Sequence, residues 1–161
     1  VLKLNQVEVI GCARSDYSFK LRSQKPSHNQ IVYFMIENNR SASEKMLTGK
    51  LVDWSKLIKT TNSYIIEMAE QNPDLNFVFK GKKNVHSRND LPKELPKNCT
   101  FLNSNPGHKF LKDANVVIAF NSTILFEAIL ANRNIIIPIF SLYTFTRIEK
   151  KGCKFCFFLI F

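Results

Sequence analysis

Four uninterrupted apolar runs, separated by polar or helix-patterned segments, place the strongest constraint on the fold of this chain. They are Ile31–Ile36, Phe77–Phe79, Val116–Phe120 and Ile135–Ile137. Strands of a parallel sheet are covered on both faces and therefore appear as continuous apolar runs, whereas a strand with one wet face alternates. The runs predict a parallel sheet buried between two layers.

Helical patterns lie between these runs. A helix from residue 54 to 69 is predicted because its apolar side chains recur at three- and four-residue steps. These residues are Trp54, Leu57, Ile58, Thr61, Ile65, Met68 and Ala69. Asp53 is the expected N-cap, and Pro73 ends the helix because proline disfavours a helical residue before it.

A second helix is expected over Thr123–Ala131, with Asn132 as a left-handed C-cap and Pro138 as the end of the following strand. Weaker patterns predict a strand at Val7–Ile10, a loop at Cys12–Asp16, a polar linker at Phe19–Gln30, a strand at Cys99–Leu102 and a short helix at Gly107–Asp113. The alternation predicts an α/β fold, a Rossmann-like open parallel sheet with helices on both faces. The tail from Ser141 onward does not continue this alternation. Its apolar end could dock as a last strand, insert at a membrane surface, or be foreign sequence from a truncated or frame-shifted reading frame.

The charge of the chain narrows the classes of partner. Its 161 residues carry a formal net charge of +10. Such an excess attracts nucleic acid, acidic membrane surfaces or phosphorylated small molecules, or is simply a solvated surface. Zinc-finger spacing, an RNA-recognition aromatic motif and a helix-turn-helix pattern are all missing from the sequence, which disfavours nucleic acid. No apolar run approaches the roughly 20 residues of a membrane-spanning helix.

The cysteines do not predict a metal site. Cys153 and Cys156 form a C-x-x-C pair, but a structural zinc site normally needs a second pair of ligands. Cys12 and Cys99 are isolated and are expected to be ordinary reduced residues. We therefore expect neither a metal nor a cofactor.

The turn after the third apolar run is the sharpest candidate site. Ligands of open parallel sheets bind at the carboxyl ends of strands. Here Asn121, Ser122 and Thr123 lead from strand to helix, where free N–H groups, the helix dipole and two hydroxyls favour a phosphate. Glu127, one turn further, can accept hydrogen bonds from a ribose diol. In the simpler interpretation Asn121 or Ser122 is only an N-cap and Glu127 only a charge near the positive helix end.

A second candidate follows Phe79, where the chain reads Lys80-Gly81-Lys82-Lys83. Lysines at this edge can meet phosphates, although a solvated basic loop explains them equally well. His86 shares the loop and is the histidine that we retain as a candidate. Neither a P-loop nor a G-x-G-x-x-G fingerprint is present. No Ser-His-Asp order or carboxylate pair identifies a catalytic residue.

The segment Val117–Ala131, followed by Asn132–Pro138, resembles a block of two-domain glycosyltransferases of the GT-B type. The resemblance is closest to bacterial surface-carbohydrate (capsule-type) biosynthesis proteins and to the CDP-glycerol glycerophosphotransferases of teichoic-acid synthesis. UDP-N-acetylglucosamine epimerases share the architecture. Val9–Asp16 resembles the Gly-x-Pro-Arg-x-Asp stretch at the domain junction of these proteins, with Ala13 where proline is usual.

The resemblance implies a division of the chain. Residues 1–30 would be an interdomain segment from a missing N-terminal domain, residues 31–140 the nucleotide-sugar-binding domain, and residues 141–161 an atypical tail that could be non-native. The N-terminal domain usually holds the catalytic base, so this truncated chain alone is expected to be inactive.

The resemblance also implies roles for individual residues. Ser122 and Thr123 would lie near the diphosphate, with Asn121 beside them, and Glu127 near the ribose. Phosphate charge would be neutralised by Arg14, Lys80 and Lys82.

The expected function is transfer of a sugar or polyol phosphate from a nucleotide-activated donor to a surface glycan. The partners would be a nucleotide-sugar donor, a glycan or lipid-linked acceptor and peripherally an anionic membrane, in the cytoplasm and without nucleic acid. Two alternatives stay open. One is a sugar-nucleotide epimerase of the same architecture, and the other is a non-catalytic basic module that binds nucleic acid or a membrane.

Overall fold

The computed structural model describes residues 13–26, 29–37, 54–120, 122–139 and 156–160. The helices are α1 (Ala13–Lys20), α3 (Trp54–Gln71) and α4 (Ile124–Leu130), with short 3-10 helices η2 (Arg88–Asp90) and η3 (Gly107–Lys112). The strands are β1 (Gln30–Phe34), β2 (Asn76–Lys80), β3 (Cys99–Leu102), β4 (Ala114–Ile118), β5 (Asn134–Ile139) and β6 (Cys156–Ile160).

The strands form a single sheet in the order β3-β2-β1-β4-β5-β6. The first five strands in this order run parallel, and β6 pairs antiparallel with β5. The chain therefore builds outward from β1 in one direction through β2 and β3, and then in the other through β4 and β5. This arrangement confirms the predicted Rossmann-like α/β fold, and its direction reverses between β1 and β4, which is where such sheets bind ligands.

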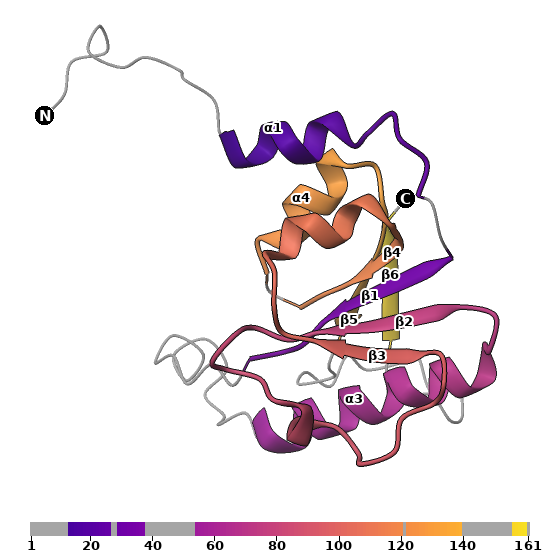
Figure 1. Ribbon diagram of the computed structural model, residues 1–161. Helices are drawn as coiled ribbons and strands as arrows, with labels where there is room; N and C mark the ends of the chain where they lie inside the picture. Colours follow the sequence, from indigo (N-terminus) through magenta and orange to yellow (C-terminus); the bar gives the residue numbers. More distant parts are fainter. Residues whose placement is uncertain (1–12, 27–28, 38–53, 121, 140–155, 161) are drawn as a thin grey trace, which may run out of the picture.

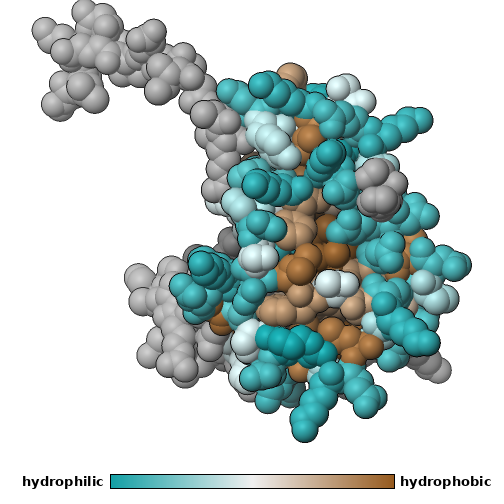
Figure 2. All heavy atoms as spheres, viewed as in Figure 1, coloured by the Kyte–Doolittle hydropathy of each residue, from teal (hydrophilic) through white to brown (hydrophobic). Residues whose placement is uncertain are grey.

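Helices cover both faces of the sheet (Figure 1). One face packs against α3 and the opposite face against α1, η3 and α4. Successive residues of a strand point to opposite faces, so Val32 belongs to the cluster under α4 and Tyr33 to the cluster under α3. On the side of the molecule that Figure 2 shows, apolar residues gather in the middle and hydrophilic residues surround them. Both faces of the sheet are covered by helices, which explains why the strands appear in the sequence as continuous apolar runs.

The long helix α3 confirms the pattern seen in the sequence. It ends at Gln71, immediately before Asn72-Pro73, and Ile65 and Ala69 are fully buried against the sheet. The same face carries Asn62, whose Oδ1 accepts a hydrogen bond of 3.1 Å from the buried Tyr33 hydroxyl. Burial raises the pKa of Tyr33 well above its usual value. Asn132 adopts a φ of 54°, as expected for a left-handed C-cap after α4.

Two local predictions are wrong. The sequence predicted a loop at Cys12–Asp16 and a linker from Phe19, whereas Ala13–Lys20 forms helix α1. Ser18 and Leu21 are buried while most neighbouring residues are exposed, so the segment shows little apolar periodicity. Packing against α4 and η3, rather than an apolar stripe, accounts for this helix.

Pro138 was expected to end the last parallel strand, but β5 continues to Ile139. Pairing of β5 with β4 stops at Ile136, so the missing N–H of Pro138 interrupts no bond on that side. On the other side Pro138 lies opposite Phe157 of β6, which places this part of the tail as an edge strand.

Several other predictions lie outside the described residues. They are the strand at Val7–Ile10, the N-cap Asp53, and the tail between residues 140 and 155. Among the helices that the structure does describe, none combines the length and apolar character needed to cross a bilayer.

Candidate functional site

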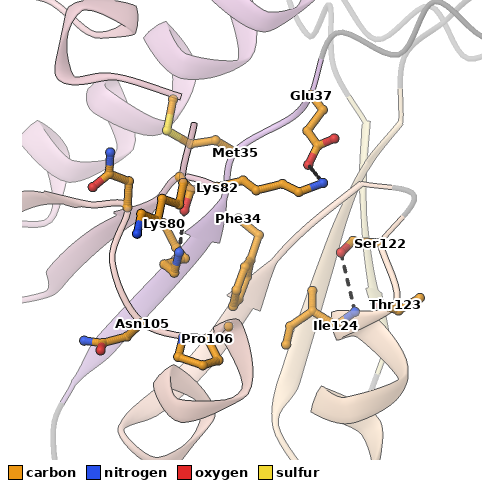
Figure 3. Close-up of a pocket in the computed structure, with 14 residues that line it drawn as sticks. Phe34, Met35, Glu37, Lys80, Lys82, Asn105, Pro106, Ser122, Thr123 and Ile124 are labelled. Carbon is orange, nitrogen blue, oxygen red and sulfur yellow. Dashed lines mark hydrogen bonds and ion pairs between the residues drawn. The ribbon is translucent and has the colours of Figure 1, made fainter. Parts of the chain in front are cut away.

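A cleft of about 640 Å³ opens at the carboxyl ends of β1, β2 and β3, beside the start of α4 (Figure 3). It lies where the direction of strand order reverses, as the rule for open parallel sheets predicts. Its lining residues are Phe34, Met35, Glu37, Lys80, Gly81, Lys82, Lys83, Asn103, Asn105, Pro106, Gly107, Ser122, Thr123 and Ile124. Segments far apart in sequence therefore meet in one hollow.

Four of the predicted site residues line this cleft together. Lys80 and Lys82 come from the end of β2, and Ser122 and Thr123 from the turn before α4. The two candidate loops thus face a common space. Their role in holding a ligand stays a prediction.

Lys80 is a buried cation, with only 7% of its surface exposed. Its Nζ donates to the carbonyl of the adjacent Gly81 and lies 5.5 Å from the centre of the Phe110 ring. Burial lowers the pKa of Lys80. None of the described carboxylates forms an ion pair with it. A charge held in this way favours an incoming anion, because its field is only weakly screened by water.

Lys82 lines the cleft and extends toward Glu37 at the end of β1, with which it pairs at 2.9 Å between Nζ and Oε1. The side chains are 63% and 43% exposed. A pair this exposed contributes roughly 0–1 kcal/mol. Lys82 can therefore leave Glu37 for a stronger anion at little cost.

The lysine loop is held in place by His86. The N–H of Lys82 donates to Nδ1 of His86 at 3.0 Å, so Nε2 carries the ring hydrogen and donates to the carbonyl of Ile36 at 3.1 Å. The ring thereby joins the end of β1 to the loop after β2. Gly81 is required beneath it, because a Cβ there would lie 2.8 Å from the Cβ of His86. His86 does not line the cleft and acts as a positioning residue for the lysine loop.

The turn before α4 differs from the sequence-based expectation. Its amides were predicted to be free for a phosphate, but three of them bond within the turn. The N–H of Ile124 donates to Ser122 Oγ at 3.4 Å, and those of Leu125 and Phe126 donate to the carbonyls of Ser122 and Thr123 at 3.1 Å. The amides of Ile124, Leu125 and Phe126 are therefore already bonded in this structure, and phosphate binding at this turn stays a prediction.

Three further predicted residues are not brought into the cleft by the described structure. Glu127 lies one turn into α4, is 5% exposed and does not line the cleft. Arg14 belongs to α1, but its side chain lies outside the described residues, as does Asn121. Their proposed contacts stay predictions.

The loop after β3 was not among the segments that the sequence predicted to form the site. Asn103, Asn105, Pro106 and Gly107 line the cleft opposite the turn before α4. Gly107 allows close packing, because a Cβ there would lie 3.0 Å from Cε1 of Phe34. The strand that precedes this loop was predicted correctly, so the carboxyl-end rule applied to it would have found these residues.

Fold and cleft together define a Rossmann-like α/β domain with a lysine-bearing cleft at the carboxyl edge of its sheet. The described residues contain no group of three or more His, Cys, Asp or Glu placed to hold a metal ion.

Comparison with known proteins gives one structural likeness. No protein-family model and no curated protein matches the chain. Among solved structures it is similar to KpsC of Thermosulfurimonas dismutans, described as a beta Kdo 2,4 transferase, with a TM-score of 0.46 and 12% identity. The match covers 84% of this chain and 47% of that one, so the chain spans about half the length of KpsC. The functional conclusion therefore depends on the residues of the cleft.

Proposed function

We propose that this chain is the donor-binding domain of a glycosyltransferase-like enzyme, which holds a nucleotide-activated sugar or polyol in the cleft. The observation that carries the proposal is the convergence of Lys80, Lys82, Ser122 and Thr123 at the point where strand order reverses. This is the position at which open α/β sheets bind nucleotides.

The charges and size of the cleft suit a diphosphate ester. Three lysines and one glutamate line it, which leaves an excess of positive charge. Its volume of about 640 Å³ falls within the roughly 300–1,000 Å³ typical of small-molecule sites. The buried Lys80 would contact the diphosphate. Lys82 would also bind the diphosphate once it has broken its ion pair with Glu37.

In transfer chemistry these groups would stabilise the departing nucleotide diphosphate. Positive charge and hydroxyl donors that are already in place lower the barrier without reorganising as charge develops. Glu127 is proposed to reach the ribose and Arg14 to add a further positive charge. The acceptor side and the catalytic base are not assigned to residues of this chain.

The wider setting rests on the sequence resemblance. Residues 117–138 resemble capsule-type and teichoic-acid enzymes, which supports a glycan or lipid-linked acceptor and peripheral contact with an anionic membrane.

Isothermal titration calorimetry with UDP- and CDP-linked donors tests the proposal. We expect binding that weakens at least about tenfold in Lys80→Met, because a charge-assisted hydrogen bond to phosphate is lost. The affinity for the donor is expected to fall about fivefold when Ser122→Ala and Thr123→Val are combined. If the Glu127 carboxylate binds the ribose, Glu127→Gln should weaken the binding of nucleotides but not the binding of inorganic pyrophosphate.

Lys93→Met is the matched control, because Lys93 is exposed and does not line the cleft. It should bind as the wild type does. Absence of nucleotide binding, or equal losses in Lys80→Met and Lys93→Met, would contradict the assignment.

A further inference from the structure

A second compartment of about 280 Å³ adjoins the cleft on the α3 side of β1. Five residues belong to both spaces: Phe34, Met35, Glu37, Ser122 and Thr123. The compartment adds Ile36, Trp54 and Phe120, and we call it the ring compartment. The two spaces share residues from the end of β1 and from the turn before α4, so they lie side by side at this edge of the sheet.

The walls of the ring compartment differ from those of the cleft. Trp54 opens α3 and Phe120 follows β4, and both are half-buried against the apolar cluster under α3. The lysines of the cleft do not line it. Glu37, Ser122 and Thr123 supply acceptors and hydroxyls at the shared rim. Aromatic walls with a polar rim suit a ring that has apolar faces and a hydroxylated edge.

We propose that the ring compartment holds the sugar ring of the donor, an inference that rests on the proposed function. A diphosphate at Lys80 and Lys82 leaves two directions for the rest of the ligand. Asn103 and Asn105 line the cleft but not the ring compartment, so their amides can meet the hydrogen-bonding edge of a base away from Trp54. The sugar then extends past Ser122 toward Trp54.

Trp54 is the single tryptophan of the sequence, so its fluorescence reports directly on the ring compartment. The full chain is titrated in parallel with inorganic pyrophosphate, UDP and UDP-N-acetylglucosamine, and with the corresponding CDP pair. We expect the sugar-linked nucleotides to change the emission by at least about a tenth, because they desolvate the indole. Pyrophosphate and the free nucleotides should bind with little change.

Two outcomes would overturn the inference while leaving the proposed function intact. A free nucleotide that changes the emission as much as its sugar-linked form would place the base, not the sugar, against Trp54. Calorimetric binding without any change in emission would show that the ring compartment is not occupied. If no nucleotide binds at all, both proposals fail together.

Variants supply an independent readout. Trp54→Leu should weaken a sugar-linked nucleotide about fivefold while UDP binds unchanged, and Trp54→Phe should retain most of the affinity. Phe126→Leu is the matched control, because Phe126 is 72% exposed on α4 and outside both spaces. Thermal melts check that each variant is folded. Equal losses for UDP and for its sugar-linked form in Trp54→Leu would contradict the inference.

Discussion

Lys80 ends a buried strand with its ammonium group between the Gly81 carbonyl and the Phe110 ring. A charge removed from water destabilises the fold unless partners replace the lost hydration. Its lowered pKa expresses the same penalty, because burial disfavours the protonated form. The anionic ligand proposed for the cleft would supply the partner that offsets this penalty.

Replacement of Lys80 by methionine therefore separates stability from binding. In urea denaturation at pH 7 we expect Lys80→Met to match the wild type or to exceed it by about 1 kcal/mol, because an apolar side chain of similar length suits the buried stem. The difference should shrink as pH rises from the lowered pKa of Lys80 toward its ordinary value of 10.5. In that window the unfolded wild type binds more protons than the folded form, so wild-type stability gains relative to the variant.

The test includes Lys82→Met as a control, since Lys82 is exposed and forms only a surface pair with Glu37. The free energy of unfolding of Lys82→Met should differ from that of the wild type by less than about 1 kcal/mol. A loss of more than about 2 kcal/mol in Lys80→Met would instead identify Lys80 as a structural residue.

The sequence predicted which of these residues meet, but not how they are held. Lys80 and Ser122 follow apolar runs, and the carboxyl ends of parallel strands share an edge. The burial of Lys80 depends on Phe110 of η3, and the position of Lys82 on His86. Those contacts arise from tertiary packing and leave no periodic signal in the sequence.

At the scale of elements, prediction succeeded where one face is strongly apolar. The helix α3 and the buried strands carry that pattern, whereas α1 does not. The turn that follows α1 is held by a guanidinium group, in addition to the packing of α1 against α4 and η3. Arg133, 7% exposed, donates from Nε to the carbonyl of Leu111 at 2.8 Å and from a terminal nitrogen to that of Gln24 at 3.0 Å. One side chain from the loop before β5 thereby joins the end of η3 to the turn after α1.

Arg133→Met should destabilise the protein by about 2–4 kcal/mol, because buried carbonyls lose their donor. Hydrogen exchange should accelerate most in α1 and η3 and least in the central strands. The matched control is Arg88→Met, whose guanidinium binds the carbonyls of Pro92 and Lys93 within its own loop. Arg88→Met should lower the free energy of unfolding by less than about 1 kcal/mol. Uniform acceleration across the sheet, or equal costs in the two variants, would refute the linking role of Arg133.

At the scale of the whole molecule, the cleft exists only because the ends of β1, β2 and β3 and the turn before α4 converge. The sequence predicted the sheet and hence this edge. The loop Asn103–Gly107 follows the correctly predicted strand β3, so the same carboxyl-end rule extends to it, although no residue pattern in the loop itself indicates a site. The sequence pattern predicted Trp54 on the apolar face of α3. That Trp54 also lines the ring compartment depends on the folded arrangement of β1, β4 and α3.

The central claim is that a nucleotide diphosphate binds at this edge of the sheet. The most direct measurement is a map of backbone amide chemical shifts in the full chain, titrated with UDP and CDP. We predict changes concentrated at the amides of Glu37, Gly81–Lys83, Asn103, Asn105, Gly107 and Ser122–Ile124. Changes confined to the outer surfaces of α1 and α3, or no changes at saturating nucleotide, would contradict the account.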